Sequence, residues 1–195
     1  RQRPKSALPL ILFVWATLWW LVAAATQLDV AETLGIGRWR FWIGYFAATI
    51  ALAAVLRARL PWWRLGWLVL TCAGLTLVTT IAFNARIGGP LAPSMLGVWA
   101  AYAIAMGWAL WNTRSESSRI PSASHLLWLW TVAIALMLQA DHLAGVWRLA
   151  DGWHFAMLVA PLMLLTLGLW RKPETFAWPR AALFADRDRL VQCLH

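Results

Sequence analysis

The sequence has few charged residues, and this shortage limits the classes of protein to which the chain can belong. Charged residues make up 13% of its 195 residues and hydrophobic residues 62%. A soluble domain has ~25% charged and ~45–50% apolar residues. A water-soluble fold of this composition would expose too much hydrocarbon, so the expected solvent is a lipid bilayer.

Cysteine is also scarce, which excludes a disulfide framework and a cysteine-rich metal centre. Cys72 lies inside an apolar stretch and Cys193 in a charged terminal segment, so we expect them at different depths. Cys72 is interpreted as a small buried apolar residue. The chain begins at Arg1 and has no signal-peptide pattern, so we expect a trimmed chain or a part of a longer one.

The common catalytic motifs are missing: no phosphate-binding glycine loop, Gly-x-Ser-x-Gly elbow or His-Glu-x-x-His pair occurs. No ionisable residue lies near the middle of an apolar stretch, where a proton-coupled carrier would need one. These absences favour a non-enzymatic protein, and no cofactor is predicted. The polar residues in the stretches are threonines, which can bond to their own helix: Thr17, Thr49, Thr76, Thr79, Thr80 and Thr131.

The sequence does contain six apolar stretches of about the length of a transmembrane helix. A helix rises ~1.5 Å per residue, so ~20 residues cross a hydrocarbon core of ~30 Å. We therefore predict an all-α, polytopic transmembrane helical bundle over residues 1–179, followed by a polar tail at 180–195. The tail is either an amphipathic helix on the membrane surface or disordered. The predicted spans are residues 8–28, 39–56, 65–83, 91–111, 125–142 and 153–170.

Lysine and arginine fall mainly on alternate connecting segments, and this bias predicts the orientation of the spans. Basic residues near a span are retained in the cytoplasm, so both termini are predicted to be cytoplasmic. Membrane threading also explains the net charge of +9 with the lipid bilayer as partner and no nucleic acid. The segments predicted outside hold Arg38, Arg40, Arg86 and Arg148. Those predicted inside hold Arg1, Arg3, Lys5, Arg57, Arg59, Arg64, Arg114, Arg119, Arg171, Lys172, Arg180, Arg187 and Arg189.

The 17 tryptophans fit the same threading, because most fall at the predicted ends of spans. Amphipathic rings prefer the headgroup level, so we interpret them as an aromatic belt. The alternative is a stacking surface for a pigment, quinone or sugar. The tryptophans that lie deeper are Trp15, Trp19, Trp20 and Trp99.

Three local patterns predict how the spans pack and connect. Gly97, Ala101, Ala105 and Ala109 are spaced four residues apart, which places them on one helix face as a packing surface for another span or a partner chain. Pro161 lies inside the last span and is predicted to kink it. The serine-rich segment 115–124 is predicted to be a connecting loop.

The main candidate site lies at the predicted outer ends of the last two spans and comprises Gln139, Asp141, His142, Asp151 and His154, with Gln27, Asp29 and Glu32 as further polar neighbours. Carboxylates and imidazoles together can bind a divalent metal or transfer protons. Asp151 and His154 can point the same way, whereas Asp141 and His142 diverge on a helix. The structural alternative is that Asp151 caps the last helix and the others are solvated. The candidate metal ligands are Asp141, His142, Asp151 and His154.

Five segments together resemble a known family in span order and aromatic placement. They are LPLILFVWATLWWLVAA (8–24), GGPLAPSMLGVWAAYAIAMGWALW (88–111), HLLWLWTVAIALMLQ (125–139), AP (160–161) and WPRAAL (178–183). The pattern is similar to a family of long, tryptophan-rich bacterial polytopic inner-membrane proteins of unknown function. The resemblance implies a bacterial cytoplasmic (inner) membrane location and a larger number of spans. It implies no catalytic residues.

Abundant packing surface without a buried ionisable site favours a non-enzymatic scaffold or accessory subunit of a larger membrane assembly. Its expected partners are lipids and other membrane protein chains. One alternative is a transport or lipid-handling protein whose path is lined by the threonines and Pro161. The other is a membrane enzyme or metal site that uses the outer Asp/His cluster.

Overall fold

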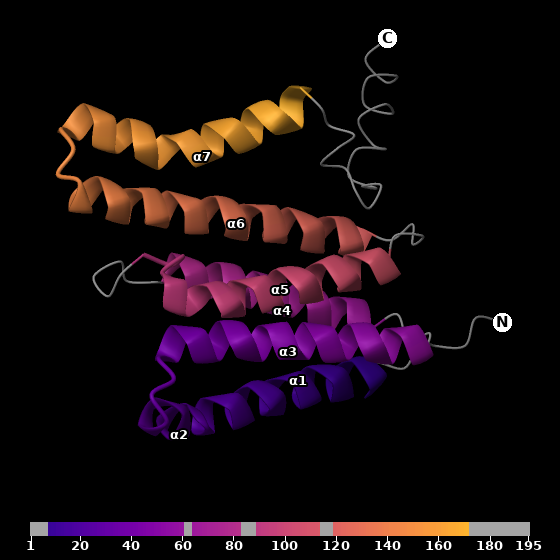
Figure 1. Ribbon diagram of the computed structural model, residues 1–195. Helices are drawn as coiled ribbons and strands as arrows, with labels where there is room; N and C mark the ends of the chain where they lie inside the picture. Colours follow the sequence, from indigo (N-terminus) through magenta and orange to yellow (C-terminus); the bar gives the residue numbers. More distant parts are fainter. Residues whose placement is uncertain (1–7, 61–63, 83–88, 114–118, 172–195) are drawn as a thin grey trace, which may run out of the picture. The chain divides into compact units, whose positions relative to one another are not determined.

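The computed structural model describes residues 8–60, 64–82, 89–113 and 119–171, and these residues form helices and short turns without a strand (Figure 1). The chain divides into two compact units, one up to Phe41 and one from Trp42 onward. The predicted tail at 180–195, with Cys193, lies outside the described residues, as do the basic residues before Leu8.

The first unit contains α1 (Leu8–Thr26), α2 (Leu28–Thr33) and the start of α3 (Arg38–Arg59). The short helix α2 was not predicted, because its sequence LDVAET has neither the length nor the apolar character of a span. It ends in a glycine-dependent turn: Gly35 has a φ of 74°. This left-handed conformation lets the Gly35 N–H bond Glu32 O while the Ile36 N–H bonds Ala31 O.

The second unit contains the rest of α3, followed by α4 (Leu65–Ile81), α5 (Pro93–Asn112), α6 (Arg119–Val146) and α7 (Asp151–Arg171). The long helix α6 packs against α4 on one side and against α7 on another, with a smaller contact to α5. Figure 1 shows α6 between α7 and the α4–α5 pair. The α3 helix lies against α5, since Asn112 Nδ2 donates to Ala54 O at 3.3 Å.

Within the described residues, five helical segments are long and apolar enough to cross a membrane. This finding confirms the coarse prediction of an all-helical membrane protein. The remaining apolar helix, α4, has 17 residues and is shorter than the others. The five segments are Leu10–Thr33, Arg38–Arg59, Pro93–Asn112, Ile120–Val146 and Asp151–Gly168.

The helix α6 is longer than the predicted span 125–142, and the prediction of a loop over 115–124 is wrong for its last part. The helix begins at Arg119, so Ser122 and Ser124 are helical, and both are buried. Pro121 is compatible with this start because the first-turn N–H groups of a helix have no intrahelical partner. A proline at this position removes no intrahelical hydrogen bond. The polar start of α6 can therefore form one continuous helix with the apolar residues that follow.

The interior of the second unit combines alanines and threonines with larger apolar side chains such as Ile50, Met106 and Leu110. Cys72 is buried, as predicted. The threonine hydroxyls donate to carbonyls four residues earlier: Thr49 to Tyr45, Thr76 to Cys72 and Thr131 to Leu127, all at 2.7–2.8 Å. This confirms that threonines satisfy their hydroxyls within their own helices, which removes most of the cost of burying them.

The last helix, α7, packs on one side against α6 and exposes large apolar side chains elsewhere. The helix continues through Pro161, and Figure 1 shows a bent ribbon in its central part, where this proline lies. Its exposed apolar side chains suit contact with lipid rather than water. They are Trp153, Phe155, Met163, Leu164, Leu167 and Trp170.

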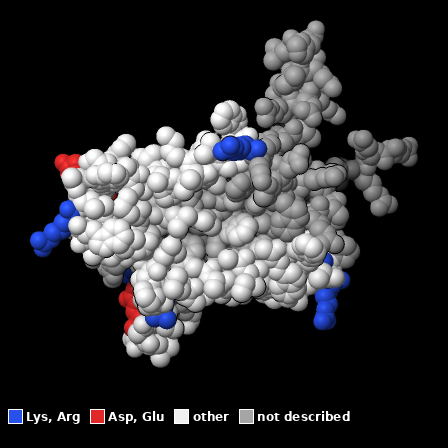
Figure 2. Space-filling model, turned by 45° about the horizontal axis from the view of Figure 1, so that its top comes forward, with Lys and Arg blue, Asp and Glu red and all other residues white. Residues whose placement is uncertain are grey.

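Uncharged residues cover most of the face drawn in Figure 2. Among the residues that the structure describes, basic and acidic side chains occur there in small separate groups. An uncharged flank is the arrangement expected where helices face hydrocarbon, because a charged side chain is costly in the bilayer centre.

Candidate functional site

The sequence-predicted cluster contains one direct contact, between α6 and α7. His154 Nε2 lies 2.7 Å from Asp141 Oδ1. Asp141 lies near the end of α6 and His154 in the first turn of α7, so a short connection brings them together. The two side chains are 42% and 36% exposed, so the pair is partly solvated rather than enclosed.

The other members of the cluster are placed differently. Asp151 is the first residue of α7 and exposed, so its carboxylate lies in the positively polarised first turn of that helix. His142 is half-buried on α6. Among the residues that the structure describes, no group of three or more His, Cys, Asp and Glu side chains is arranged to hold a metal ion. The geometry thus gives a carboxylate–imidazole pair, and the wider metal set stays a prediction.

The side chain of Gln139 has a role that the sequence did not reveal. Its Oε1 accepts the N–H of Leu91 at 2.9 Å, so α6 holds the turn that precedes α5. Trp99 holds the same turn from α5, because its Nε1 donates to Pro90 O at 2.8 Å. A Cβ on Gly89 would collide with the Gln139 amide, so a larger residue there requires that side chain to move away from Leu91. Gln139 is therefore a structural residue here.

The predicted small-residue face of α5 is divided between the interior and the surface. Ala105 and Ala109 are buried within the described bundle, as a packing surface requires. Gly97 and Ala101 are exposed, and a Cβ on Gly97 would meet nothing within 4 Å. The C-terminal half of this helix face is therefore packed inside the bundle, and its N-terminal half is exposed.

A cluster of hydroxyl groups lies buried where α4, α5 and α6 meet. Tyr102 is 1% exposed, and its hydroxyl lies beside those of Thr76 and Thr131, which are fully buried. Sequence reasoning named both threonines but missed Tyr102. A tyrosine in the middle of an apolar span was the available signal, because its hydroxyl usually requires a polar neighbour when buried.

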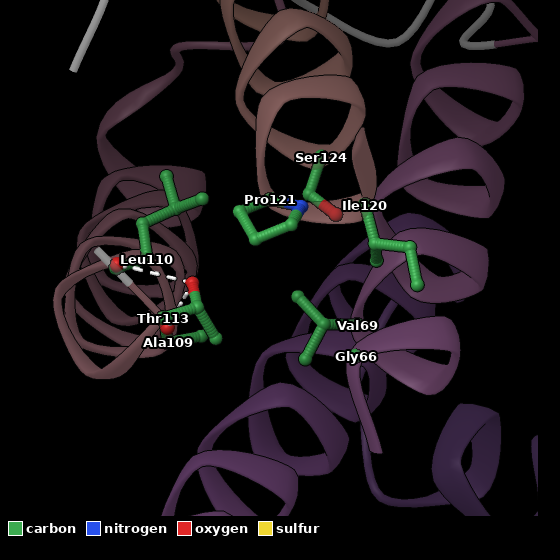
Figure 3. A pocket seen from close by; sticks show the side chains of 8 residues that line it. All are labelled: Gly66, Val69, Ala109, Leu110, Thr113, Ile120, Pro121 and Ser124. Carbon is green, nitrogen blue, oxygen red and sulfur yellow. Dashed lines mark hydrogen bonds between the residues drawn. The ribbon is translucent and has the colours of Figure 1, made fainter. Parts of the chain in front are cut away.

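A small pocket lies near the ends of three helices (Figure 3). Gly66 and Val69 line it from the start of α4, Ala109 and Leu110 from the end of α5, and Ile120, Pro121 and Ser124 from the start of α6, while Thr113 directly follows α5. Its empty volume is about 250 Å³, much of it open to the outside, and its lining is mainly apolar. The polar groups in the wall are the hydroxyls of Thr113 and Ser124.

Comparisons of the chain with protein-family models, with curated proteins and with solved structures found no match. The resemblance to long bacterial inner-membrane proteins therefore stays a prediction. Any functional conclusion has to come from the geometry of the chain itself.

Proposed function

We propose that the chain is a six-pass protein of the bacterial inner membrane, with both termini in the cytoplasm, that serves as a non-enzymatic scaffold or accessory subunit. Five membrane-length helices and the shorter apolar α4 support the six passes. The alternation of basic residues along the sequence supports the orientation. The partners are lipids and other membrane protein chains.

The exposed half of the small-residue face of α5 carries the scaffold proposal. Gly97 and Ala101 present a smooth surface one turn long, where a second helix can approach closely. In lipid, close packing and interhelical contacts drive helix association, because no hydrophobic effect operates between helices. Their buried continuation, Ala105 and Ala109, already packs in this way inside the bundle.

The decisive experiment places larger side chains on this surface and measures the size of the complex after mild detergent has extracted it from native membranes. Replacement of Gly97 and Ala101 by leucine should abolish a larger complex that the unchanged chain forms in mild detergent. Ala103→Leu is the matched control, because Ala103 is exposed on another face of α5 and should leave the complex intact. A stable monomer of the unchanged chain, or a complex indifferent to the double substitution, would contradict the proposal.

A transport function is the second candidate, and the buried Tyr102 hydroxyl favours it. Burial of a polar group inside a membrane bundle costs free energy, and such groups often bind a solute that is being transported. The test adds a small neutral hydroxylated solute to the outside of vesicles that contain the purified protein. The vesicles first shrink osmotically, and the rate at which they swell again measures entry of the solute. A transporter would give faster re-swelling than empty vesicles, and Tyr102→Phe would slow it. Equal rates with and without protein would exclude this class of solute.

A further inference from the structure

Ser124 Oγ and Trp128 Nε1 are buried polar atoms of the second unit that have no hydrogen-bond partner among the described residues, and Tyr102 Oη is buried beside the hydroxyls of Thr76 and Thr131. Ser124, Trp128 and Thr131 follow one another on α6 at spacings of four and three residues, so they share one helix face. Thr131 in turn lies beside Tyr102. We call this row of Ser124, Trp128, Thr131 and Tyr102 the polar seam.

A buried polar atom without a partner costs about 1–3 kcal/mol. Lipid tails cannot supply the missing hydrogen bonds. The partner must accept from the indole N–H of Trp128 and also exchange hydrogen bonds with the hydroxyls of Ser124 and Tyr102. Water meets both requirements and is small enough for a closely packed interior.

The pocket at the helix ends borders the polar seam at Ser124. In Figure 3 the hydroxyl of Ser124 points into the space between Pro121, Ile120 and Val69. The Thr113 hydroxyl in the opposite wall donates to the carbonyls of Ala109 and Leu110, which leaves its oxygen available as an acceptor. The pocket is large enough to hold an ordered water.

We propose that ordered water enters the bundle at the Ser124 pocket and occupies the polar seam as far as Tyr102. From Ser124 to Thr131 the helix rises about 10 Å, which is about a third of the hydrocarbon thickness. Water along the polar seam thus hydrates one end of the bundle interior, and the hydrated region ends at the hydroxyls of Thr76, Thr131 and Tyr102. This inference does not depend on the scaffold function or on the transport function.

The experiment measures the reactivity of single thiols with a small methanethiosulfonate reagent. The thiolate attacks the sulfenyl sulfur of the reagent, forms a disulfide and releases methanesulfinate, and ionisation of the thiol requires water at the sulfur. Cys72 and Cys193 are first replaced by alanine and serine. Ser124→Cys and Thr131→Cys are then compared with Ile104→Cys, whose position on α5 is 71% exposed on the outer surface of the span. The protein is held in lipid vesicles with reagent on both sides.

The proposal predicts modification of Ser124→Cys at least tenfold faster than Ile104→Cys, with Thr131→Cys between them. Equal inertness of all three thiols would overturn it. A second measurement, the Tm of alanine variants, does not depend on the folding of the cysteine variants. Removal of a hydroxyl that binds water should lower the Tm, whereas removal of a dry, unpaired hydroxyl should raise it. We expect Ser124→Ala to lower the Tm by a few degrees and the exposed control Ser94→Ala to leave it unchanged. A higher Tm for Ser124→Ala would contradict the proposal.

Discussion

Asp141 and His154 join two helices across a short connection, with His154 Nε2 2.7 Å from Asp141 Oδ1. The link lies at the end of the α6–α7 pair where the chain reverses direction, between Val146 and Asp151. Among the candidate metal ligands Asp141, His142, Asp151 and His154, it is the only pair for which the structure shows a direct side-chain contact. The contact thus connects the first turn of α7 to α6.

Asp141→Asn should lower the free energy of unfolding by less than about 1 kcal/mol, because both partners are partly exposed and such pairs contribute little. His154→Gln should have a similar effect. The double variant should cost less than the sum of the two single variants, which a double-mutant cycle in detergent measures. Strictly additive losses would show that the two side chains do not interact.

Gly89→Ala should destabilise the protein by about 1–2 kcal/mol, because the new methyl group displaces the Gln139 amide from Leu91 N–H. Gln139→Ala should cost about 1 kcal/mol through loss of the same hydrogen bond. In a Gln139→Ala background the added cost of Gly89→Ala should largely disappear. Unfolding by denaturant measures all three variants, and an unchanged cost in that background would refute this explanation of Gly89.

Gly66→Ala and Gly107→Ala form a matched pair of helical glycines. A Cβ on Gly66 would lie 3.2 Å from Arg57 Nη1 and 3.3 Å from Ile120 Cγ2, whereas one on Gly107 meets nothing within 4 Å. Alanine is favoured over glycine in a helix by about 1 kcal/mol, so Gly107→Ala should be neutral or stabilising. Gly66→Ala should be the less stable of the two by at least 1 °C in Tm. The reverse order would contradict the close packing at the start of α4.

Substitutions at Gly35 and Arg148, which follow the ends of α2 and α6, should have opposite effects on stability. Both residues have positive φ, 74° and 49°. In the second turn Leu149 N–H bonds Ala144 O, the same pattern that ends α2. Arg148→Gly should raise stability by about 0.5–1 kcal/mol, and Gly35→Ala should lower it by about 1 kcal/mol. Thermal unfolding in detergent measures both, and stabilisation by Gly35→Ala would show that the turn can change conformation.

The orientation can be tested with reporter fusions. A fluorescent protein that matures only in the cytoplasm should be bright at either terminus, and alkaline phosphatase should be active when fused after Arg148. The physical reason is the concentration of basic residues in alternate segments. An active phosphatase at the N-terminus would reverse the predicted topology.

Much of the helical layout was predictable from the sequence, because span-length apolar stretches have few alternatives to a helix in a bilayer. The stretch 39–56 became Arg38–Arg59, and 91–111 became Pro93–Asn112. The start of α6 was missed because Ser122 and Ser124 resemble loop residues, and only the neighbouring helices show that their side chains are buried.

The candidate site was only partly predictable, because helix rotation and pairing determine which polar groups meet. Asp141 and His142 diverge on α6, and Asp141 alone contacts His154. Gln139 had no sequence signal for its bond to Leu91, since the two residues are 48 positions apart. Tyr102 could have been singled out as a mid-span tyrosine, but its threonine neighbours come from two other helices.

The unequal lengths of α4 and α6 have a consequence for the surrounding membrane. With 17 residues α4 rises about 26 Å, and with 28 residues α6 rises about 42 Å. In the proposed six-pass arrangement α4 falls short of a hydrocarbon layer of ~30 Å, whereas the extra length of α6 includes polar residues such as Arg119 and Asp141 that can lie outside the hydrocarbon. The hydrophobic mismatch therefore arises at α4 and favours locally thinned lipid beside it. Acyl-chain length should therefore tune the stability of this bundle, with the optimum in bilayers thinner than average.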